Sequence, residues 1–179
     1  MESTAAEPTH VVIVGAGFAG LACARVLARA RGFQVTVVDR NPYHVFSPLL
    51  YQVATGGLPE DDIAYPVRAA ARSARFRRGA VVAIDPTART VRLADGSTMA
   101  WDQLVLATGS TGTTFRIPGV EQNALQMKTI PQAREIRRRL LQAYEDVDLG
   151  RAAREDLQVV VVGGGPTGVE LAGAIAELQ

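Results

Sequence analysis

Cysteine is nearly absent from this sequence, and its scarcity excludes one class of protein. Cys23 is the only cysteine among 179 residues. A single cysteine cannot form an internal disulfide, so the chain is not a disulfide-stapled secreted scaffold. Because Cys23 falls in an apolar stretch that we expect to be helical, we interpret it as a small core residue.

Excess charge and long apolar runs are also missing. The chain has 19 basic and 18 acidic residues, which gives no case for nucleic acid binding. No apolar run approaches the roughly 20 residues that span a bilayer. Glu2 and Glu7, with no basic residue before the first apolar run, do not fit a signal peptide. We therefore expect a cytoplasmic protein, and we expect no metal site.

The stretch from Val11 to Gly20 has the order that a dinucleotide-binding turn requires. Four β-forming residues lead into Gly15, Gly17 and Gly20, and a helix-forming run follows. At such a turn, backbone N–H groups and the positive end of the helix face a diphosphate. The three glycines would permit the turn, the approach of the pyrophosphate and close helix packing, in that order. We expect the helix to end near Gly32.

A second predicted strand, Gln34 to Asp39, ends on an acid. Asp39 lies 24 residues after Gly15, near the spacing of roughly 20 expected of a carboxylate that binds the adenosine ribose. Three glycines alone are weak evidence, and Asp39 alone could be a surface acid. The order of strand, glycine turn, helix, strand and acid favours ribose binding.

The segment from Arg40 to Gly57 contains three aromatic residues, two prolines and His44. We interpret it as an ordered loop that covers a large flat ligand; a hydrophobic cluster under a loop is an equally weighted alternative. His44 is expected to be a structural hydrogen-bonding residue. A helix is predicted over 61–73. The arginines of 68–78 are interpreted as a solvated face, with an anion or membrane-surface patch as the minority alternative.

The pattern then changes to short strands. We predict strands at 81–84, 90–93, 98–101 and 104–106, which form an antiparallel meander inserted between parallel strands. Ala107 to Ser110 is a small-residue turn that lets the backbone approach a ligand. A helix is predicted over 131–149, with Leu140 and Leu141 on its apolar side.

A second glycine turn follows a predicted buried strand, Gln158 to Val162. Gly163, Gly165 and Gly168 repeat the first spacing, and a helix is predicted over 169–178. Two such turns suggest two dinucleotides, one a flavin and one a nicotinamide, with the protein supplying binding and orientation. The predicted fold is α/β and doubly wound, with one Rossmann-like dinucleotide-binding domain over 1–120 and the start of a second over 121–179; the resemblance given next implies that the first is an FAD-binding domain and the second an NAD(H)-binding domain.

These motifs together resemble the type II NADH dehydrogenases, single-subunit flavoproteins of the two-dinucleotide-fold superfamily. The resemblance covers nearly the whole chain, and the glycine turns and Ala107–Gly109 are shared across the superfamily. The segment Asn41–Gly56 is its specific part. The resemblance implies that NADH passes a hydride to N5 of FAD, and that the reduced flavin passes two electrons to a membrane quinone.

The resemblance also implies roles for individual residues. FAD would be bound by Gly15, Ala16, Gly17, Phe18, Ala19, Gly20, Asp39, Arg40, Ser47, Pro48, Val81, Ala107, Thr108 and Gly109. Arg40 would lie beside the adenosine, Val81 or its neighbour would bond adenine, and Ser47 and Pro48 would pass near the isoalloxazine. NADH would be bound by Gly163, Gly165, Pro166, Thr167 and Gly168. Glu170 would be the catalytic residue near both rings; the alternative is a helix acid favoured by the dipole.

The resembled proteins are much longer than 179 residues. Their quinone segment, membrane-associating helices and the acid that selects NADH over NADPH would lie beyond Gln179. The resemblance implies a peripheral protein at the inner face of the cell membrane, and it leaves a homodimer open. With Cys23 alone, the dithiol relay of the related disulfide reductases is impossible in this chain. Two alternatives remain: a flavin reductase with a soluble acceptor, and a truncated FAD-binding fragment without catalysis.

Overall fold

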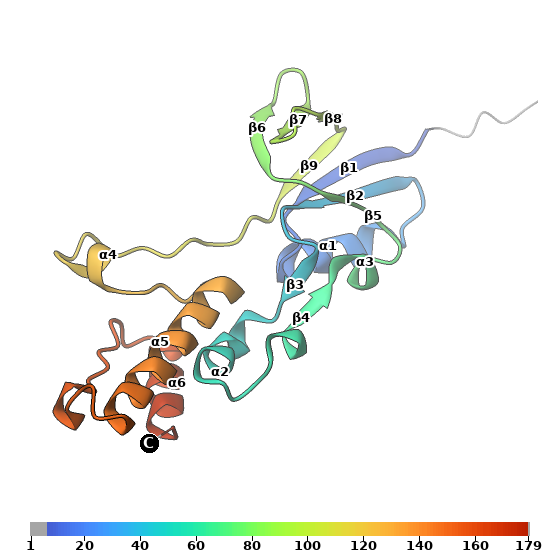
Figure 1. The fold of residues 1–179 in the computed structure, drawn as a ribbon. Coiled ribbons are helices and arrows are strands. Elements are labelled where there is room, and N and C mark those ends of the chain that lie inside the picture. The colour runs from blue at the N-terminus through green and yellow to red at the C-terminus, as the bar shows by residue number, and fades with distance from the viewer. Residues whose placement is uncertain (1–6, 179) are drawn as a thin grey trace, which may run out of the picture. The chain divides into compact units, whose positions relative to one another are not determined.

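The computed structural model describes residues 7–178, which divide into two compact units (Figure 1). The first unit is formed by Met1–His44 and Tyr65–Ser110, and the second by Val45–Ala64 and Thr111–Gln179. Residues 1–6 lie outside the described part of the chain, and the first strand begins at Thr9.

A four-stranded parallel sheet forms the centre of the first unit. Its order is β5 (Arg75–Arg78), β2 (Phe33–Asp39), β1 (Thr9–Val14), β9 (Gln103–Leu106). All three pairings are parallel, and Val14 lies opposite both Val38 and Leu106. The predicted α/β class is confirmed. Both glycine-turn strands were predicted, but only the first forms a strand.

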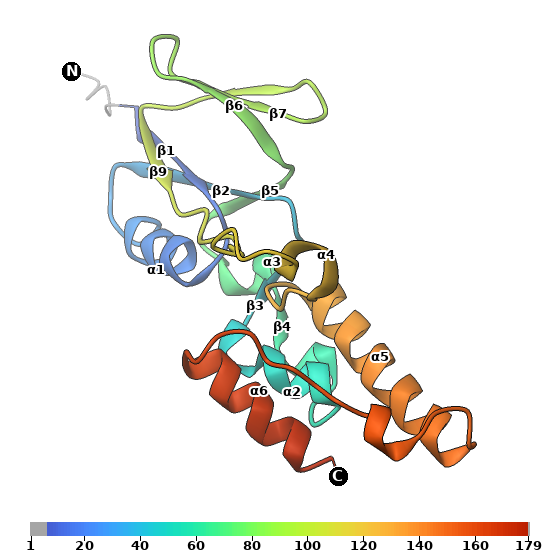
Figure 2. The same cartoon turned by 90° about the vertical axis from the view of Figure 1, so that its left-hand side faces the viewer.

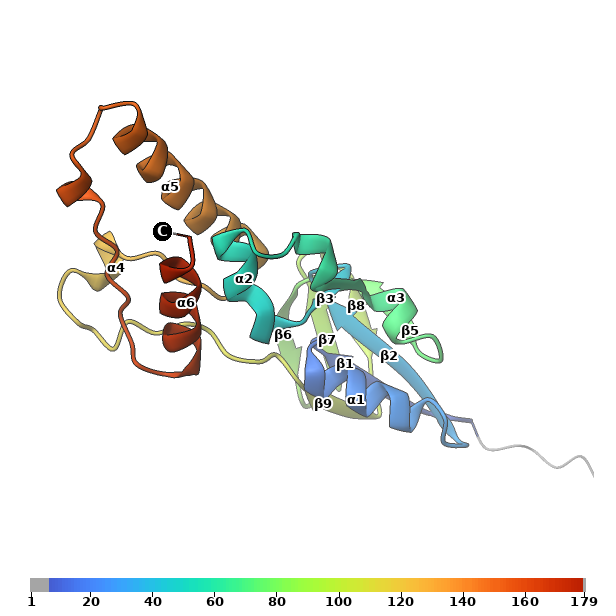
Figure 3. The ribbon, with the colours of Figure 1, turned by 90° about the horizontal axis from the view of Figure 1, so that it is seen from below.

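The two faces of this sheet carry different layers. Helices α1 (Phe18–Leu27) and α3 (Val67–Ala70) cover one face, as Figure 3 shows from below. The antiparallel meander of β6 (Val81–Asp85), β7 (Thr90–Leu93) and β8 (Thr98–Ala100) covers the other. Val11 and Ile13 pack on the helix side, whereas Val12 and Val14 pack against the meander. Because successive side chains of β1 point to opposite faces, the strand contributes to two hydrophobic cores, as expected of a buried parallel strand.

An ion pair ties the meander to the sheet. Arg77 of β5 donates to Asp95, in the turn between β7 and β8, over 2.6 Å. The side chain of Ser97 also donates to Asp95, and this bond is the main cause that holds the pKa of Asp95 below its ordinary value of 3.8. Three of the clustered arginines thus have structural partners, since Arg68 lies over the ring of Phe76 and Arg78 donates to the carbonyl of Arg40.

The second unit is helical. Helix α2 (Leu50–Thr55) packs against α5 (Ile130–Asp148) and α6 (Pro166–Ala176), as Figure 2 shows. Thr129 and Gln132 form a capping box that starts α5. Shorter pieces complete the unit: η1 (Ser47–Leu49), η2 (Glu60–Asp62), α4 (Val120–Asn123) and η3 (Arg154–Asp156). Strands β3 (Tyr43–Val45) and β4 (Ala64–Pro66) pair where the chain passes between the units.

Ion pairs of α5 lie on its exposed side. Arg134 binds Glu60 through both carboxylate oxygens, at 2.6 and 2.7 Å. Glu135 accepts from Arg138 and Arg139, and these hydrogen bonds lower the pKa of Glu135 to about 2. Charges this exposed contribute little to stability. Arg138 and Arg139 therefore lie on a solvated face of α5.

Several predicted elements are wrong in type or extent. The helix predicted over 61–73 is instead η2, β4 and α3, because Pro66 has no N–H and forces the preceding residue to be extended. The first helix ends at Leu27 rather than near Gly32, whose carbonyl accepts from Thr9 and belongs to the sheet. The arginine-rich stretch at 75–78 is not only a solvated face but the edge strand β5.

One more correction concerns the first unit: 104–106 was predicted within the antiparallel meander, but it lies in β9, which pairs parallel with β1. The remaining corrections concern the second unit. The stretch Gln158–Val162 forms no strand within residues 7–178, and Val160 is 82% exposed. A strand needs a partner for its N–H and C=O groups, and no described segment pairs with this one. The predicted loop 40–57 contains β3, η1 and α2, and Leu141 is 50% exposed rather than apolar-side.

Candidate functional site

The first glycine turn connects β1 to α1 in a conformation that depends on two of its glycines. Gly15 has a φ of +108°, and a Cβ there would clash with the backbone of Ala107. A Cβ at Gly20 would clash with the carbonyl of Gly15. These positions therefore require glycine, for a positive φ and for close packing respectively. Both roles agree with the mechanical reasons expected from the sequence.

Gly17 is the glycine that faces open space. It is the N-cap of α1, with a φ of −76° that other residues also adopt, and a Cβ there would meet nothing within 4 Å. The Gly17 N–H has no hydrogen-bond partner among residues 7–178. An anion can therefore approach this N–H and the positive end of the helix directly.

Asp39 holds the turn from the end of β2. One carboxylate oxygen accepts from the N–H of Ala16 at 2.7 Å, and the other accepts from the N–H of Asn41 at 2.8 Å. Both bonds leave lone pairs on the carboxylate, which is available to further donors such as ribose hydroxyls. The structure brings together Asp39 and the first turn, as the sequence predicted.

Residues after β9 complete this end of the sheet. The Ala107 N–H donates to the carbonyl of Val14 at 2.8 Å, and the backbone N of Thr108 lies 3.2 Å from the position of a Cβ on Gly15. Gly109 has a φ of +72°. The small-residue turn therefore lies directly against the glycine turn, at the carboxyl edge where ligands of open α/β sheets bind.

His44 contacts the first glycine turn, which the sequence did not predict. Its Nδ1 lies 3.0 Å from the carbonyl oxygen of Ala16, and its ring lies edge-to-face with Phe18, with centroids 4.9 Å apart. The expectation of a structural hydrogen-bonding role is confirmed. No sequence signal indicated the partner, because the contact spans 28 residues.

The second glycine turn repeats the backbone of the first. Gly163 has a φ of +116°, and a Cβ at Gly168 would clash with the carbonyl of Gly163. Gly165 is the N-cap of α6 with φ −75° and ψ 173°, against −76° and −168° at Gly17. The Val169 N–H donates to Gly165 at 3.1 Å, as Leu21 donates to Gly17 at 3.0 Å. The same local anion-binding geometry is therefore built twice.

The other predicted site residues lie on both units. Arg40 follows Asp39, and its carbonyl accepts from Arg78 Nε at 3.4 Å. Val81 begins β6 and packs on the meander side of the sheet. Ser47 and Pro48 form exposed positions of η1, and Pro166, Thr167 and Glu170 lie at the start of α6. The ligand roles of all these residues stay predictions.

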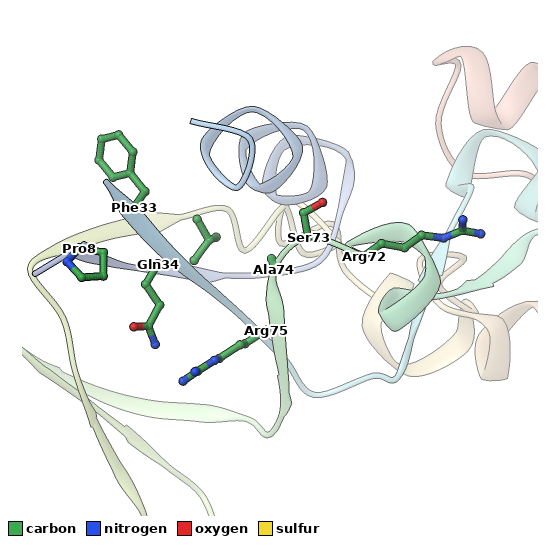
Figure 4. Close-up of a pocket in the computed structure, with 8 residues that line it drawn as sticks. Pro8, Phe33, Gln34, Arg72, Ser73, Ala74 and Arg75 are labelled. Atoms are coloured by element: carbon green, nitrogen blue, oxygen red, sulfur yellow. The ribbon is translucent and has the colours of Figure 1, made fainter. Parts of the chain in front are cut away.

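A separate hollow of about 480 Å³ lies at the opposite end of the first unit (Figure 4). It is lined by Pro8, Phe33–Val35 and Arg72–Arg75, near the amino ends of β2 and β5. The side chain of Arg72 extends away from the other lining residues. The hollow is open, and it lies away from the carboxyl ends of β1, β2 and β9, where the first glycine turn is. We therefore place the functional site at the turns.

A metal site and a membrane span are not found among the described residues. Within residues 7–178, no three side chains of His, Cys, Asp or Glu gather so as to hold a metal ion. None of the helices described is long and apolar enough to cross a membrane.

Comparison with known proteins decides the family. The family model described as pyridine nucleotide-disulphide oxidoreductase matches residues 9–179. This chain belongs to that family. The match includes both glycine turns, Asp39 and Ala107–Gly109.

Individual relatives narrow the likeness. The chain is 45% identical, over 94% of its length, to the type II NADH:quinone oxidoreductase NdhA of Mycobacterium tuberculosis. It is 40% identical, over 99% of its length, to the type II NADH:quinone oxidoreductase Ndh of the same organism. The chain spans 38% and 40% of the lengths of these two relatives.

A solved structure agrees with the fold. NDH2 of Plasmodium falciparum in complex with NADH matches with a TM-score of 0.82 and 26% identity, over 95% of this chain and 37% of that one. The fold expected from the resemblance, Rossmann-type dinucleotide binding, is confirmed by this match and by the family model.

Proposed function

We propose that this chain is the dinucleotide-binding part of an FAD-dependent oxidoreductase that passes electrons from NADH through the flavin to a membrane quinone. The observation that carries the proposal is the repetition of one anion-binding backbone at Gly15–Gly20 and Gly163–Gly168. Two such turns suit two dinucleotides. The relatives named as NADH:quinone oxidoreductases supply the class of reaction.

The first turn fits the diphosphate of FAD. The Gly17 N–H and the open space around Gly17 would receive it, and Asp39 would accept from the ribose hydroxyls. Arg40 would lie beside the adenosine, and the backbone of Val81 would bond adenine. Ala107, Thr108 and Gly109 would lie against the cofactor. When bound, the flavin supplies two-electron chemistry between a nicotinamide and a quinone.

The second turn would bind NADH. Gly163, Gly165 and Gly168 would form the diphosphate turn, and Pro166 and Thr167 would start the helix beside it. Glu170 is the fifth residue of α6, beyond the first turn where the helix dipole acts most strongly. Its carboxylate would orient the nicotinamide, and Ser47 and Pro48 would exclude water beside the flavin ring. In this proposal, residues 1–120 belong to the FAD domain and 121–179 begin the NAD(H) domain.

The location and partners follow the same relatives. A quinone acceptor dissolves in the membrane, so the protein would act at the inner face of the cell membrane as a peripheral protein. Contact with the membrane would come from segments other than residues 7–178, where no helix could span it. A homodimer fits this arrangement.

Cofactor content and acceptor use test the proposal. The purified protein should release FAD on denaturation, and its NADH oxidation should depend on added quinone. FMN in place of FAD, or oxidation of NADH that quinone does not accelerate, would contradict it. The Gly165→Ala variant should keep its FAD and lose NADH oxidation, because the added methyl group occupies the space of the diphosphate in the second turn only.

A further inference from the structure

The peptide between Ala16 and Gly17 decides whether the first turn attracts or repels an anion. A trans peptide is planar, so its C=O and N–H point in opposite directions. With the carbonyl of Ala16 directed at His44, the N–H of Gly17 is directed the other way, where no residue among 7–178 accepts from it. A reversed peptide would present a carbonyl oxygen to the diphosphate and repel it.

Reversal of this peptide would cost little without a restraint. Rotating it changes ψ of Ala16 and φ of Gly17, and glycine adopts positive and negative φ almost equally well. Gly17 leaves room for the ligand, but it also allows the peptide whose N–H binds that ligand to rotate. A hydrogen bond from outside the turn is needed to hold one orientation.

Two side chains restrain Ala16. Asp39 accepts its N–H at 2.7 Å, and His44 Nδ1 lies 3.0 Å from its carbonyl oxygen. A carbonyl oxygen can only accept, so Nδ1 carries the hydrogen and donates. The edge-to-face contact with Phe18, at 85° between ring planes, fixes the imidazole in turn.

We propose that His44 is a positioning residue that locks the Ala16–Gly17 peptide with its N–H directed at the diphosphate of FAD. This inference rests on the proposed FAD site. His44 acts through the backbone of the turn, and its contribution is to orient the donor before the ligand arrives. Such preorganisation raises affinity by removing the cost of ordering on binding.

The second turn lacks this lock. Among residues 7–178, no side chain bonds to the backbone of Gly164, which corresponds to Ala16. The difference suits the two proposed ligands: a resident cofactor benefits from a rigid site, whereas a substrate must leave after each turnover. Loss of the His44 hydrogen bond is therefore expected to lower the affinity for FAD and not the affinity for NADH.

The two histidines of the chain provide a matched experiment. The side chain of His10 also makes one hydrogen bond within the first unit, between Nε2 and Thr36 Oγ1 at 2.9 Å, at the other end of β1. FAD is removed from the purified full-length protein, and FAD affinity is measured by titration for wild type, His44→Leu, His44→Asn and His10→Leu. The unfolding temperature of each FAD-free protein and the dissociation constant for NADH are measured in parallel.

We expect His44→Leu to weaken FAD binding roughly five- to tenfold, the value of one hydrogen bond. His44→Asn should stay within about twofold of wild type, because its amide nitrogen takes the place of Nδ1. His10→Leu should leave FAD affinity unchanged, and NADH affinity should not change in any variant. Equal FAD affinity in His44→Leu and wild type, or no recovery in His44→Asn, would overturn the proposal.

Two further variants keep the result decisive. Should His44→Leu fail to fold, His44→Gln replaces it, since its longer side chain carries the amide near the position of Nε2 rather than Nδ1. Gly17→Ala tests the site itself. Loss of FAD binding in Gly17→Ala with none in the His44 variants would reject the lock alone, whereas unchanged binding in Gly17→Ala would reject the proposed FAD site.

Discussion

The carboxylate of Asp39 accepts a hydrogen bond of 2.7 Å from the backbone N–H of Ala16, across 23 residues of sequence. The acid expected to bind a ribose therefore also holds the turn expected to bind the adjacent diphosphate. One side chain thus couples the two parts of the proposed adenosine-diphosphate site. The sequence indicated the first role but not the second.

Removing the Asp39 carboxylate should weaken FAD binding more than one contact would. Asp39→Ala loses the ribose acceptor and releases the Ala16 N–H, so we expect affinity to fall roughly 10- to 100-fold. Asp39→Asn keeps one acceptor oxygen, so its FAD affinity should lie between those of wild type and Asp39→Ala. FAD titration of the stripped protein measures both. Asp85→Ala is the matched control, because Asp85 likewise accepts from two backbone N–H groups, of Thr87 and Ala88, outside the site; similar losses in both variants would contradict the assignment.

Adding one methyl group at Gly17 should block the site without disturbing the fold. A Cβ there meets nothing within 4 Å and φ is −76°, so the FAD-free Gly17→Ala protein should unfold at or above the wild-type temperature. Its FAD affinity should fall at least about tenfold, because the methyl group occupies the space of the diphosphate.

Gly173→Ala is the control for Gly17→Ala. Gly173 lies within α6, and a Cβ there also meets nothing within 4 Å. It should unfold at or above the wild-type temperature and keep wild-type FAD affinity. Unchanged FAD affinity in Gly17→Ala would show that the first turn does not bind the cofactor.

Glu170→Gln should slow reduction of the flavin while FAD content stays constant. If the carboxylate orients the nicotinamide, the reduction rate at saturating NADH should fall at least about tenfold. Stopped-flow measurement of flavin absorbance gives this rate. Glu177→Gln, at the other end of α6, should keep the wild-type rate. A Glu170→Gln protein with only a lower unfolding temperature would favour the helix-dipole alternative.

The interactions of Asp95 should make a small contribution to stability in a defined pH range, because its ion pair with Arg77 is exposed. Ser97 and Arg77 lower the pKa of Asp95 below 3.8, so its contribution is full above that value and is lost as the pH falls through the lower folded-state pKa. Urea unfolding of Asp95→Asn should therefore show a deficit at pH 7 that disappears in strong acid. Asp61→Asn, at an exposed carboxylate for which residues 7–178 show no ion pair, should match wild type throughout; a deficit that persists in strong acid would contradict the stated cause.

Glycine positions are the part of the site that the sequence predicts well. The order of strand, turn and helix fixes where Gly15, Gly20, Gly163 and Gly168 must lie, because each conformation or close approach excludes a side chain. Short-range geometry determines both turns. They therefore appear in the structure even where the predicted strand before the second turn does not form.

Pairing and distant contacts are the part that the sequence does not predict. Arg75–Arg78 has the composition of a solvated face, and only its position beside β2 makes it a strand. The contact of His44 with Ala16 depends on the path of β3, which no periodicity encodes. Pro66 by itself indicates that no helix can continue through this position. The helix predicted over 61–73 rested on the spacing of apolar residues, which Pro66 overrides.

Anaerobic reduction of the bound flavin by NADH, followed by addition of a soluble quinone, tests the central claim most directly. The account predicts that the visible flavin absorbance of the purified protein disappears with one equivalent of NADH and returns when quinone is added. It also predicts that Gly165→Ala keeps the absorbance and does not respond to NADH. A flavin that NADH does not reduce in the wild-type protein, or a reduced flavin that quinone does not reoxidise, would contradict the account.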